Sequence, residues 1–282
     1  MTLYPKRKKY MKVAITGGGG FLWKKIVDYF FQYWHEVISC QRRKVSEISG
    51  VQYVYFDLKD TVSENIFKDV DVFIHCASNV DYTKSKKTLI KENLDTLKNV
   101  IKISQYAKKI IYISSSSVYQ WLSWEIYTTT PINILNLKNA YSYSKYMAEE
   151  YIHANFKNEN IIILRPRAIY WEWDTTLIPQ ILKNSFLWYL LLPWNGKTVT
   201  SISEVSSFVK YIYKCSCEEK SWIFNFRTEE KTYEEIYEKI IKEYHFKGII
   251  HLPYIVLEIL LIFNKNKYSY IVDTFLNDKI LK

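Results

Sequence analysis

The chain has 282 residues, of which 48% are hydrophobic and 24% are charged, and this composition excludes a disordered, collagen-like or disulfide-scaffold protein. The length suits one large domain, or a nucleotide-binding domain that carries a smaller lobe. The 4 cysteines and 5 histidines form no Cys-x-x-Cys pair and no His-Glu-x-x-His motif. We therefore expect no metal site and reduced cysteines.

The formal net charge of +10 is compatible with a nucleic-acid surface. The basic residues are nevertheless scattered mostly singly along the chain, so we expect no nucleic-acid partner. No apolar run reaches the roughly 18 residues of a membrane helix, because the longest candidate, 255–263, is interrupted by Glu258. The basic N-terminus lacks the apolar stretch of a signal peptide. We therefore expect a cytoplasmic protein without a membrane partner.

Short apolar segments alternate with helical or polar segments in the first part of the chain. Residues 12–16 predict a strand, four glycines follow it, and the next segment has the apolar spacing of a helix. Further strands are expected at 36–40, 51–55, 70–75, 110–114 and 161–164, and helices at 89–106 and 141–155. The intervals permit right-handed crossovers, so the pattern predicts a Rossmann-like α/β fold with a doubly wound parallel sheet.

The rhythm of the pattern changes after residue 166. Helices are expected there at 178–183, 205–215, 233–244 and 253–263, and a strand at 222–226. We interpret these elements as a smaller lobe that covers the carboxyl edge of the sheet. The expected organisation is a basic N-terminal extension (1–10), a dinucleotide-binding domain (11–170) and a substrate-binding lobe over most of 171–282, whose truncation we leave open.

Glycines directly after the first strand predict a phosphate site. Gly17 and Gly20 would allow a tight turn in which backbone N–H groups approach a pyrophosphate at the positive end of the next helix. The first helical turn, Phe21, Leu22 and Trp23, would lie against the same group. A glycine run alone is often a plain turn, but the strand before it and the helix after it favour dinucleotide binding.

Residues after the second and third strands indicate which dinucleotide binds. An acidic residue at the end of the second strand is typical of NAD, whereas Arg42 could hold the additional phosphate of NADP. We therefore favour NADP over NAD, with the alternative that Arg42 is a solvated loop residue. Asp57 could accept a hydrogen bond from the adenine amino group or cap its own turn.

A second motif follows the fifth strand, where four serines occupy 114–117. Further along, Tyr141 and Lys145 are four residues apart on an expected helix, so they share a face. A neighbouring ammonium lowers the pKa of a phenol, which starts near 10. Tyr141 is therefore a candidate acid-base group, and the alternative is a surface tyrosine near a lysine.

Together these stretches resemble an extended short-chain dehydrogenase/reductase of the NAD-dependent epimerase/dehydratase family, over residues 11–265. The matching stretches are TGGGGFL, FDLKD, DVFIHCAS, ENLDTLKNV, ISSSSVY, YSYSK and LRPRAIY. The resemblance implies that Ser115 hydrogen-bonds the reacting oxygen, Tyr141 exchanges its proton and Lys145 holds the nicotinamide ribose. It also implies three further residues beside the cofactor: Leu58, Ala77 and Asn93.

The sequence departs from the family pattern where that pattern has glycine. A third glycine is expected at position 23, where the helix packs closely on the strand, and the indole of Trp23 should clash there. Tryptophan occupies six such positions: Trp23, Trp34, Trp171, Trp173, Trp194 and Trp222. The chain has 9 Trp and only 7 Gly, and exchanging them would bring glycine close to its ordinary share of about 7%.

We hypothesise that the gene comes from a lineage that reads the codon UGA as glycine, and that it was translated with a table that reads UGA as tryptophan. The alternative is a degenerate homologue whose tryptophans are real. Two other departures are Gln120, at a family glycine, and 206–207, two serines that replace a usual acidic pair. The remaining tryptophans, Trp121, Trp124 and Trp188, do not align securely.

The resemblance implies an NAD(P)-dependent oxidoreductase with a small-molecule substrate. The stretch LRPRAIY, followed by Asp174 and Ile178, is more similar to the hydroxysteroid-dehydrogenase-like branch, which favours hydride transfer at a secondary alcohol or ketone. Two alternatives stay open: a nucleotide-sugar 4-epimerase or dehydratase with tightly held NAD, and a non-catalytic dinucleotide-binding homologue. Relatives commonly dimerise, so we leave a homodimer open as well.

Overall fold

The main element of the fold is a seven-stranded parallel sheet. The computed structural model describes residues 10–17, 21–44, 47–60, 64–80, 85–156, 161–170, 177–217 and 223–282. The strand order is β12-β7-β5-β4-β1-β2-β3. The strands are β1 (Lys12–Thr16), β2 (Glu36–Gln41), β3 (Gln52–Tyr55), β4 (Val72–His75), β5 (Lys109–Ile113), β7 (Ile161–Pro166) and β12 (Ile223–Phe226). The order reverses between β1 and β4, and this confirms the predicted doubly wound fold.

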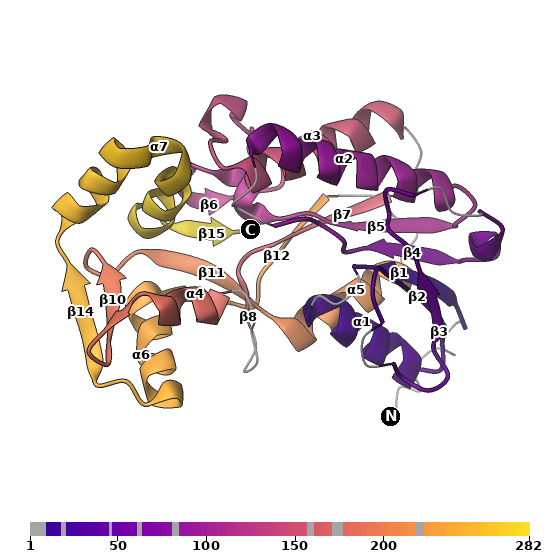
Figure 1. Ribbon diagram of the computed structural model, residues 1–282, viewed down its shortest axis with the longest axis horizontal. Coiled ribbons are helices and arrows are strands. Elements are labelled where there is room, and N and C mark those ends of the chain that lie inside the picture. The colour runs from indigo at the N-terminus through magenta and orange to yellow at the C-terminus, as the bar shows by residue number, and fades with distance from the viewer. Residues whose placement is uncertain are drawn as a thin grey trace, which may run out of the picture.

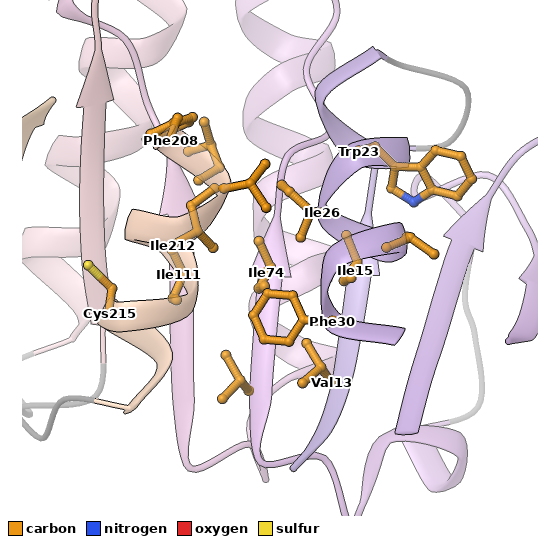
Figure 2. Close-up of a cluster of buried hydrophobic side chains, with 14 of the residues drawn as sticks. Val13, Ile15, Trp23, Ile26, Phe30, Ile74, Ile111, Phe208, Ile212 and Cys215 are labelled. Atoms are coloured by element: carbon orange, nitrogen blue, oxygen red, sulfur yellow. The ribbon is translucent and has the colours of Figure 1, made fainter. Parts of the chain in front are cut away.

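Two pairs of helices cover the two faces of this sheet (Figure 1). One face carries α1 (Phe21–Gln32) and α5 (Val205–Cys217), and the other carries α2 (Lys86–Ile103) and α3 (Ala140–Asn155). Figure 2 shows how side chains of α1 and α5 pack on the strands to form one of the buried clusters. The strands are apolar on both faces because helices bury both of them.

A smaller lobe lies at one end of the sheet (Figure 1). Its helices are α4 (Leu177–Lys183), α6 (Tyr233–Tyr244) and α7 (Tyr254–Leu276). One small sheet has the order β14-β10-β9 and another the order β13-β11-β15-β6, with β8 paired to β11. Their strands are β6 (Trp124–Ile126), β8 (Ile169–Tyr170), β9 (Ser185–Phe186), β10 (Tyr189–Pro193), β11 (Val199–Glu204), β13 (Glu229–Thr232), β14 (Gly248–Leu252) and β15 (Lys279–Leu281). Short 3-10 helices are η1 (Glu64–Phe67), η2 (Ser116–Tyr119) and η3 (Ile134–Asn136).

The lobe is smaller than the sequence suggests. The elements α5 and β12, which the sequence analysis assigned to the lobe, lie on the main sheet, where β12 pairs with β7. Conversely, β6 comes from the first part of the chain but belongs to the lobe, where it pairs with β15 near the C-terminus. Within the described ranges, no helix combines the length and apolarity that crossing a membrane requires.

Candidate functional site

The predicted site residues gather where the central strands end. Gly17 directly follows β1, Ala77 lies two residues beyond β4, and Ser115 lies two residues beyond β5. Helix α3, which carries Tyr141 and Lys145, packs against α2 and against the short helix η2 next to Ser115. Because ligands of doubly wound sheets bind at the carboxyl ends of the strands near the reversal of strand order, this edge is the candidate site.

Lys145 is the most constrained of the three predicted catalytic residues. Its side chain is buried, and its Nζ donates a hydrogen bond to the Ile113 carbonyl at 2.7 Å. The same Nζ lies 5.7 Å from the centroid of the Tyr141 ring and 4.8 Å from that of Tyr112. Burial lowers the pKa of Lys145 to about 8, although nearby Cys76 and Glu149 oppose the shift. The ammonium is therefore fixed beside the Tyr141 ring.

Tyr141 lies in the first turn of α3, and its backbone is held from two sides. The Asn139 side chain caps the helix by accepting from the Tyr141 and Ser142 N–H groups at 2.8 and 3.1 Å. The Ser144 hydroxyl donates to the Tyr141 carbonyl at 2.8 Å. A helix cap of this kind contributes about 1 kcal/mol, so the turn that carries the phenol is well anchored.

Ser115 is the N-cap residue of η2. Its Oγ accepts a hydrogen bond from the Ser117 N–H at 3.1 Å, and its side chain is half-buried. The structure thus brings Ser115, which caps η2, and Tyr141 and Lys145 of α3 to one edge of the sheet. Their catalytic roles stay predictions.

Asn93, predicted to lie beside the cofactor, is buried between α2 and α3. Its amide nitrogen donates to the Ser144 hydroxyl at 2.9 Å and to the Asn79 carbonyl at 3.0 Å. Its amide oxygen accepts from the Asn79 N–H at 2.7 Å. Because the Ser144 hydroxyl in turn donates to the Tyr141 carbonyl, Asn93 stabilises the start of α3 through Ser144.

A buried ion pair behind the site was not anticipated from the sequence. The Glu149 carboxylate accepts from Arg165 Nε at 3.0 and 3.1 Å, and it also accepts from the Ser114 hydroxyl. Arg165 additionally donates to the Tyr119 hydroxyl. The pair joins α3 to β7 and to the residue before Ser115. The one signal in the sequence was that Glu149 lies four residues after Lys145, on the same helical face.

At Gly17, the backbone at the end of β1 comes close to the backbone of Cys76 and Ala77, which follow β4. Its φ is 135°, and a Cβ there would lie 3.1 Å from Cys76 Cβ and 3.4 Å from the Ala77 nitrogen. A side chain would fill this space, so a glycine is required. The side chains of Leu22 and Ala77 are half-buried. Gly20 and the side chain of Phe21 lie outside the described residues.

Arg42, predicted to select NADP, contacts Asp57, which was predicted to bind the adenine or to cap its turn. Arg42 is exposed, and its guanidinium lies 4.0 Å from the Asp57 carboxylate. Asp57 also accepts a hydrogen bond from the Lys59 N–H at 3.0 Å, as its alternative role in a turn requires. Leu58 is half-buried, and its carbonyl accepts from Asn99 at 2.9 Å.

The fit of a dinucleotide is good at this edge except at position 23. The side chain of Trp23 is 3% exposed and belongs to the buried cluster that Figure 2 shows. Its Nε1–H finds no hydrogen-bond partner within the described part of the chain, and burying such a donor costs about 1–3 kcal/mol. The indole therefore occupies a position where the fold requires close packing of helix on strand.

A pocket of about 370 Å³ lies in the lobe, between β8, α4, β11, β13 and α6. Its apolar lining consists of four isoleucines: Ile178, Ile202, Ile236 and Ile240. Its ionisable lining consists of four carboxylates and two ammonium groups: Glu204, Glu229, Glu235, Glu243, Lys231 and Lys239. Tyr170, the last residue of β8, donates to Glu229 at 2.6 Å. The pocket is therefore apolar with an excess of negative charge.

Two of the carboxylates also stabilise helix starts. Glu204 accepts from the N–H groups of Ser206 and Ser207 at 2.7 and 2.6 Å, so an acidic side chain does hold the start of α5, one residue before Val205. Glu235 forms a capping box with Thr232 at the start of α6. Among the described residues, no cluster of His, Cys, Asp and Glu could hold a metal ion.

Comparison with known proteins finds an NAD-binding family and several enzymes among the relatives of this chain. A family model for an NAD-binding domain, described as male sterility protein, matches residues 24–204, which is more than half of the chain. A sterol-4-alpha-carboxylate 3-dehydrogenase (decarboxylating) of Dictyostelium discoideum is 27% identical over 67% of this chain and 62% of its own length. A 2-alkyl-3-oxoalkanoate reductase of Stenotrophomonas maltophilia is 25% identical over 62% of this chain and 56% of its own.

A protein of Methanocaldococcus jannaschii, provisionally named a UDP-glucose 4-epimerase, is 29% identical over 50% of this chain and 49% of its own length. The chain therefore spans about half to three fifths of these relatives. Among solved structures, the UDP-glucuronic acid 4-epimerase of Bacillus cereus with NAD has a TM-score of 0.72 at 18% identity, covering 86% of both chains. The Helicobacter pylori ADP-L-glycero-D-manno-heptose-6-epimerase has a TM-score of 0.73 at 17% identity, covering 89% and 88%. At these identities the structures show a shared fold.

Proposed function

Because the chain belongs to the NAD-binding family described as male sterility protein, we propose that it is an NAD(P)-dependent oxidoreductase acting on a secondary alcohol or ketone. The observation that carries the proposal is the buried Lys145 ammonium beside the Tyr141 ring, 5.7 Å from its centroid. We place the cofactor in the 11–170 domain and the rest of the substrate in the lobe. Dimerisation stays a prediction.

In this proposal each side chain has one task. Tyr141 exchanges a proton with the substrate oxygen, and the Lys145 ammonium, held by the Ile113 carbonyl at 2.7 Å, favours the phenolate form. Ser115 donates a hydrogen bond to the same substrate oxygen. The nicotinamide supplies or accepts the hydride when it is bound.

The lining of the lobe pocket disfavours a substrate with several negative charges. Four carboxylates, two ammonium groups and four isoleucines line it. A nucleotide sugar carries a diphosphate, which this excess of negative charge would repel. The dehydrogenase and reductase relatives are named for a sterol carboxylate and an oxoalkanoate, whose single carboxylate carries less negative charge than a diphosphate.

A second candidate is a nucleotide-sugar epimerase or dehydratase. The provisional name of the archaeal relative supports it, since the same tyrosine and lysine would serve a transient keto sugar. Such an enzyme retains its NAD during turnover. Purified protein that already contains NAD and converts UDP-glucose without added cofactor would establish this candidate in place of the first.

For the cofactor we propose NADP, on the strength of Arg42 at the end of β2. Arg42 is exposed and paired only loosely with Asp57, at 4.0 Å, so its guanidinium can reach a phosphate. We expect Arg42→Ala to weaken NADP binding about tenfold or more, a loss of about 1.4 kcal/mol, and to leave NAD binding unchanged. Calorimetric titration of both cofactors measures this, and equal losses for both would contradict the proposal.

The reaction itself is tested with Tyr141→Phe and with Tyr143→Phe as a matched control on the same helix. Removing a general acid-base group costs about a hundredfold to ten-thousandfold in rate, so Tyr141→Phe should lose reduction of a panel of ketones. Tyr143→Phe should keep it. Undiminished turnover by Tyr141→Phe, followed through NADPH absorbance, would leave only a binding role for this site.

A further inference from the structure

The tryptophans share an unusual backbone conformation. Seven non-glycine residues have positive φ in the described part of the chain, and five of them are tryptophan. These are Trp34, Trp121, Trp124, Trp188 and Trp194, with φ of 63, 63, 67, 70 and 65°. Positive φ is rare for bulky residues and ordinary for glycine. Of the described tryptophans, only Trp23 lies outside this conformation.

Trp34 occupies the position after α1 that glycine most often fills. The His35 N–H donates to the Phe30 carbonyl at 3.2 Å, and the Trp34 N–H donates to the Phe31 carbonyl at 3.0 Å. These two hydrogen bonds define a Schellman motif, with Trp34 as its left-handed residue. The indole contributes little there, because Trp34 is 87% exposed.

Trp121 occupies the glycine position of a tight turn. The Leu122 N–H donates to the Tyr119 carbonyl at 3.1 Å, which closes a four-residue turn. Gln120 has φ −55° and ψ 134°, and Trp121 has φ 63°. This is the pattern of a type II turn, whose third residue requires positive φ and is therefore usually glycine. The glycine that the family pattern places at Gln120 is thus required one residue later.

Trp188 occupies the second position of a two-residue hairpin loop. The strands β9 and β10 pair through Phe186 and Tyr189, so only Leu187 and Trp188 connect them. Both have positive φ, 48° and 70°. A type I′ turn requires positive φ at both positions and prefers glycine at the second.

We propose that glycine is the natural residue at all nine tryptophan positions, and that the gene encodes it with UGA, which its cells read as glycine. The backbone argument also applies to the three tryptophans that the family pattern leaves unaligned, because Trp121, Trp124 and Trp188 all have positive φ. Selection of real tryptophans for a binding surface would not explain their shared φ. It would also not explain their locations, since Trp34 lies on the sheet domain, whereas Trp188 and Trp194 lie on the lobe.

Position 23 is where this inference bears on function, and that part rests on the proposed function. Glycine there removes the buried indole, whose Nε1–H has no partner among the described residues. It also allows the start of α1 to pack closely on β1, as binding of a pyrophosphate at that helix end requires. The natural site therefore has Gly17 and glycine at position 23 on either side of the turn.

Codons and peptide masses test the inference directly. We expect UGA in the gene at all nine positions, and glycine masses for the corresponding peptides of the protein isolated from its own cells. The codon UGG, or tryptophan masses, at 34, 121 and 188 would overturn the inference. Neither measurement depends on activity.

Stability tests the backbone argument in the purified chain. We expect Trp34→Gly to unfold at a higher temperature than Trp34→Ala, because alanine is as disfavoured as tryptophan at positive φ. Tyr106 is the matched control, since it is an exposed aromatic residue in a turn without positive φ. There the order should reverse, with alanine above glycine. The same order at both positions would contradict a left-handed requirement at 34.

Cofactor binding tests position 23. The chain with glycine at all nine positions is compared with one that keeps only Trp23, by calorimetric titration with NADP and with NAD. We expect the first to bind at least tenfold more tightly. Equal binding would overturn the role of position 23, whereas an all-glycine chain that binds neither cofactor would overturn the proposed function and leave the codon inference intact.

Discussion

Helices α1 and α3 both start at the carboxyl edge of the same sheet, yet they are anchored very differently. The start of α3 is capped by Asn139 and supported through Ser144 and Asn93. The first turn of α1 instead contains Trp23, whose buried N–H has no partner in the described part of the chain. The proposed catalytic side of the site is therefore well formed by the sequence as written, whereas the proposed phosphate side is not.

The largest expected effect comes from breaking the ion pair behind α3. Both side chains are almost fully buried, and Glu149→Gln would leave the Arg165 guanidinium without its counter-charge. Removing one partner of a buried pair costs about 3–5 kcal/mol. We expect a loss of that size in the free energy of unfolding, measured in urea.

The exposed pair Lys91–Asp95 on α2, at 3.6 Å, is the control for this substitution. Surface pairs at this spacing contribute about 0.3–0.5 kcal/mol, so Asp95→Asn should be nearly neutral. If Glu149→Gln were as mild as Asp95→Asn, the pair would not be what anchors α3.

A smaller effect is expected in the pH dependence of stability. Burial lowers the pKa of Lys145 from 10.5 to about 8, so between these values the unfolded chain binds more protons than the folded one. Stability contributed by this group therefore rises with pH across that window, by about 3 kcal/mol in total. Below pH 8 the folded chain buries the Lys145 ammonium in its charged form, so the full loss of stability from that burial is present.

Lys145→Met should remove this rise, and unfolding at pH 7.5 and at pH 10 measures it against the unsubstituted chain. Burial also lowers the pKa of Lys279 to about 8, against the effect of its buried partner Asp273. Lys279→Met should therefore flatten the same window independently. An unchanged slope in Lys145→Met would mean that its ammonium is hydrated.

The sequence predicts the sheet domain well because the relevant signals are local. Strand β1, the glycine at 17 and the spacing of Tyr141 and Lys145 each lie within a few residues, and their periods distinguish strand from helix. The short lobe strands escape such reasoning. Strand β15 pairs with β6, which is far from it in the sequence. Each of these strands has three residues, too few to show an alternation of apolar and polar positions.

Buried charge is the second kind of feature that the sequence could not reveal. Glu149 and Arg165 have the polarity of solvated residues, and only the packing of α3 on the sheet shows that they pair. Arg42 and Asp57 were given separate tasks toward the cofactor, but they face each other. The excess of tryptophan over glycine, in contrast, is visible in the composition alone. The positive φ of five tryptophans agrees with it.

The smallest expected effect concerns the cap of α3. Asn139→Ala removes the acceptor for the Tyr141 and Ser142 N–H groups and should cost about 1 kcal/mol. Asn133→Ala is the control, because Asn133 is exposed and accepts one hydrogen bond, from the Leu135 N–H at 3.0 Å, at the start of the short η3. We expect the first variant to lower both the unfolding free energy and turnover, since the cap fixes the turn that carries the phenol. If Asn139→Ala lowered stability but left turnover intact, Ser144 and Asn93 alone would be sufficient to position Tyr141.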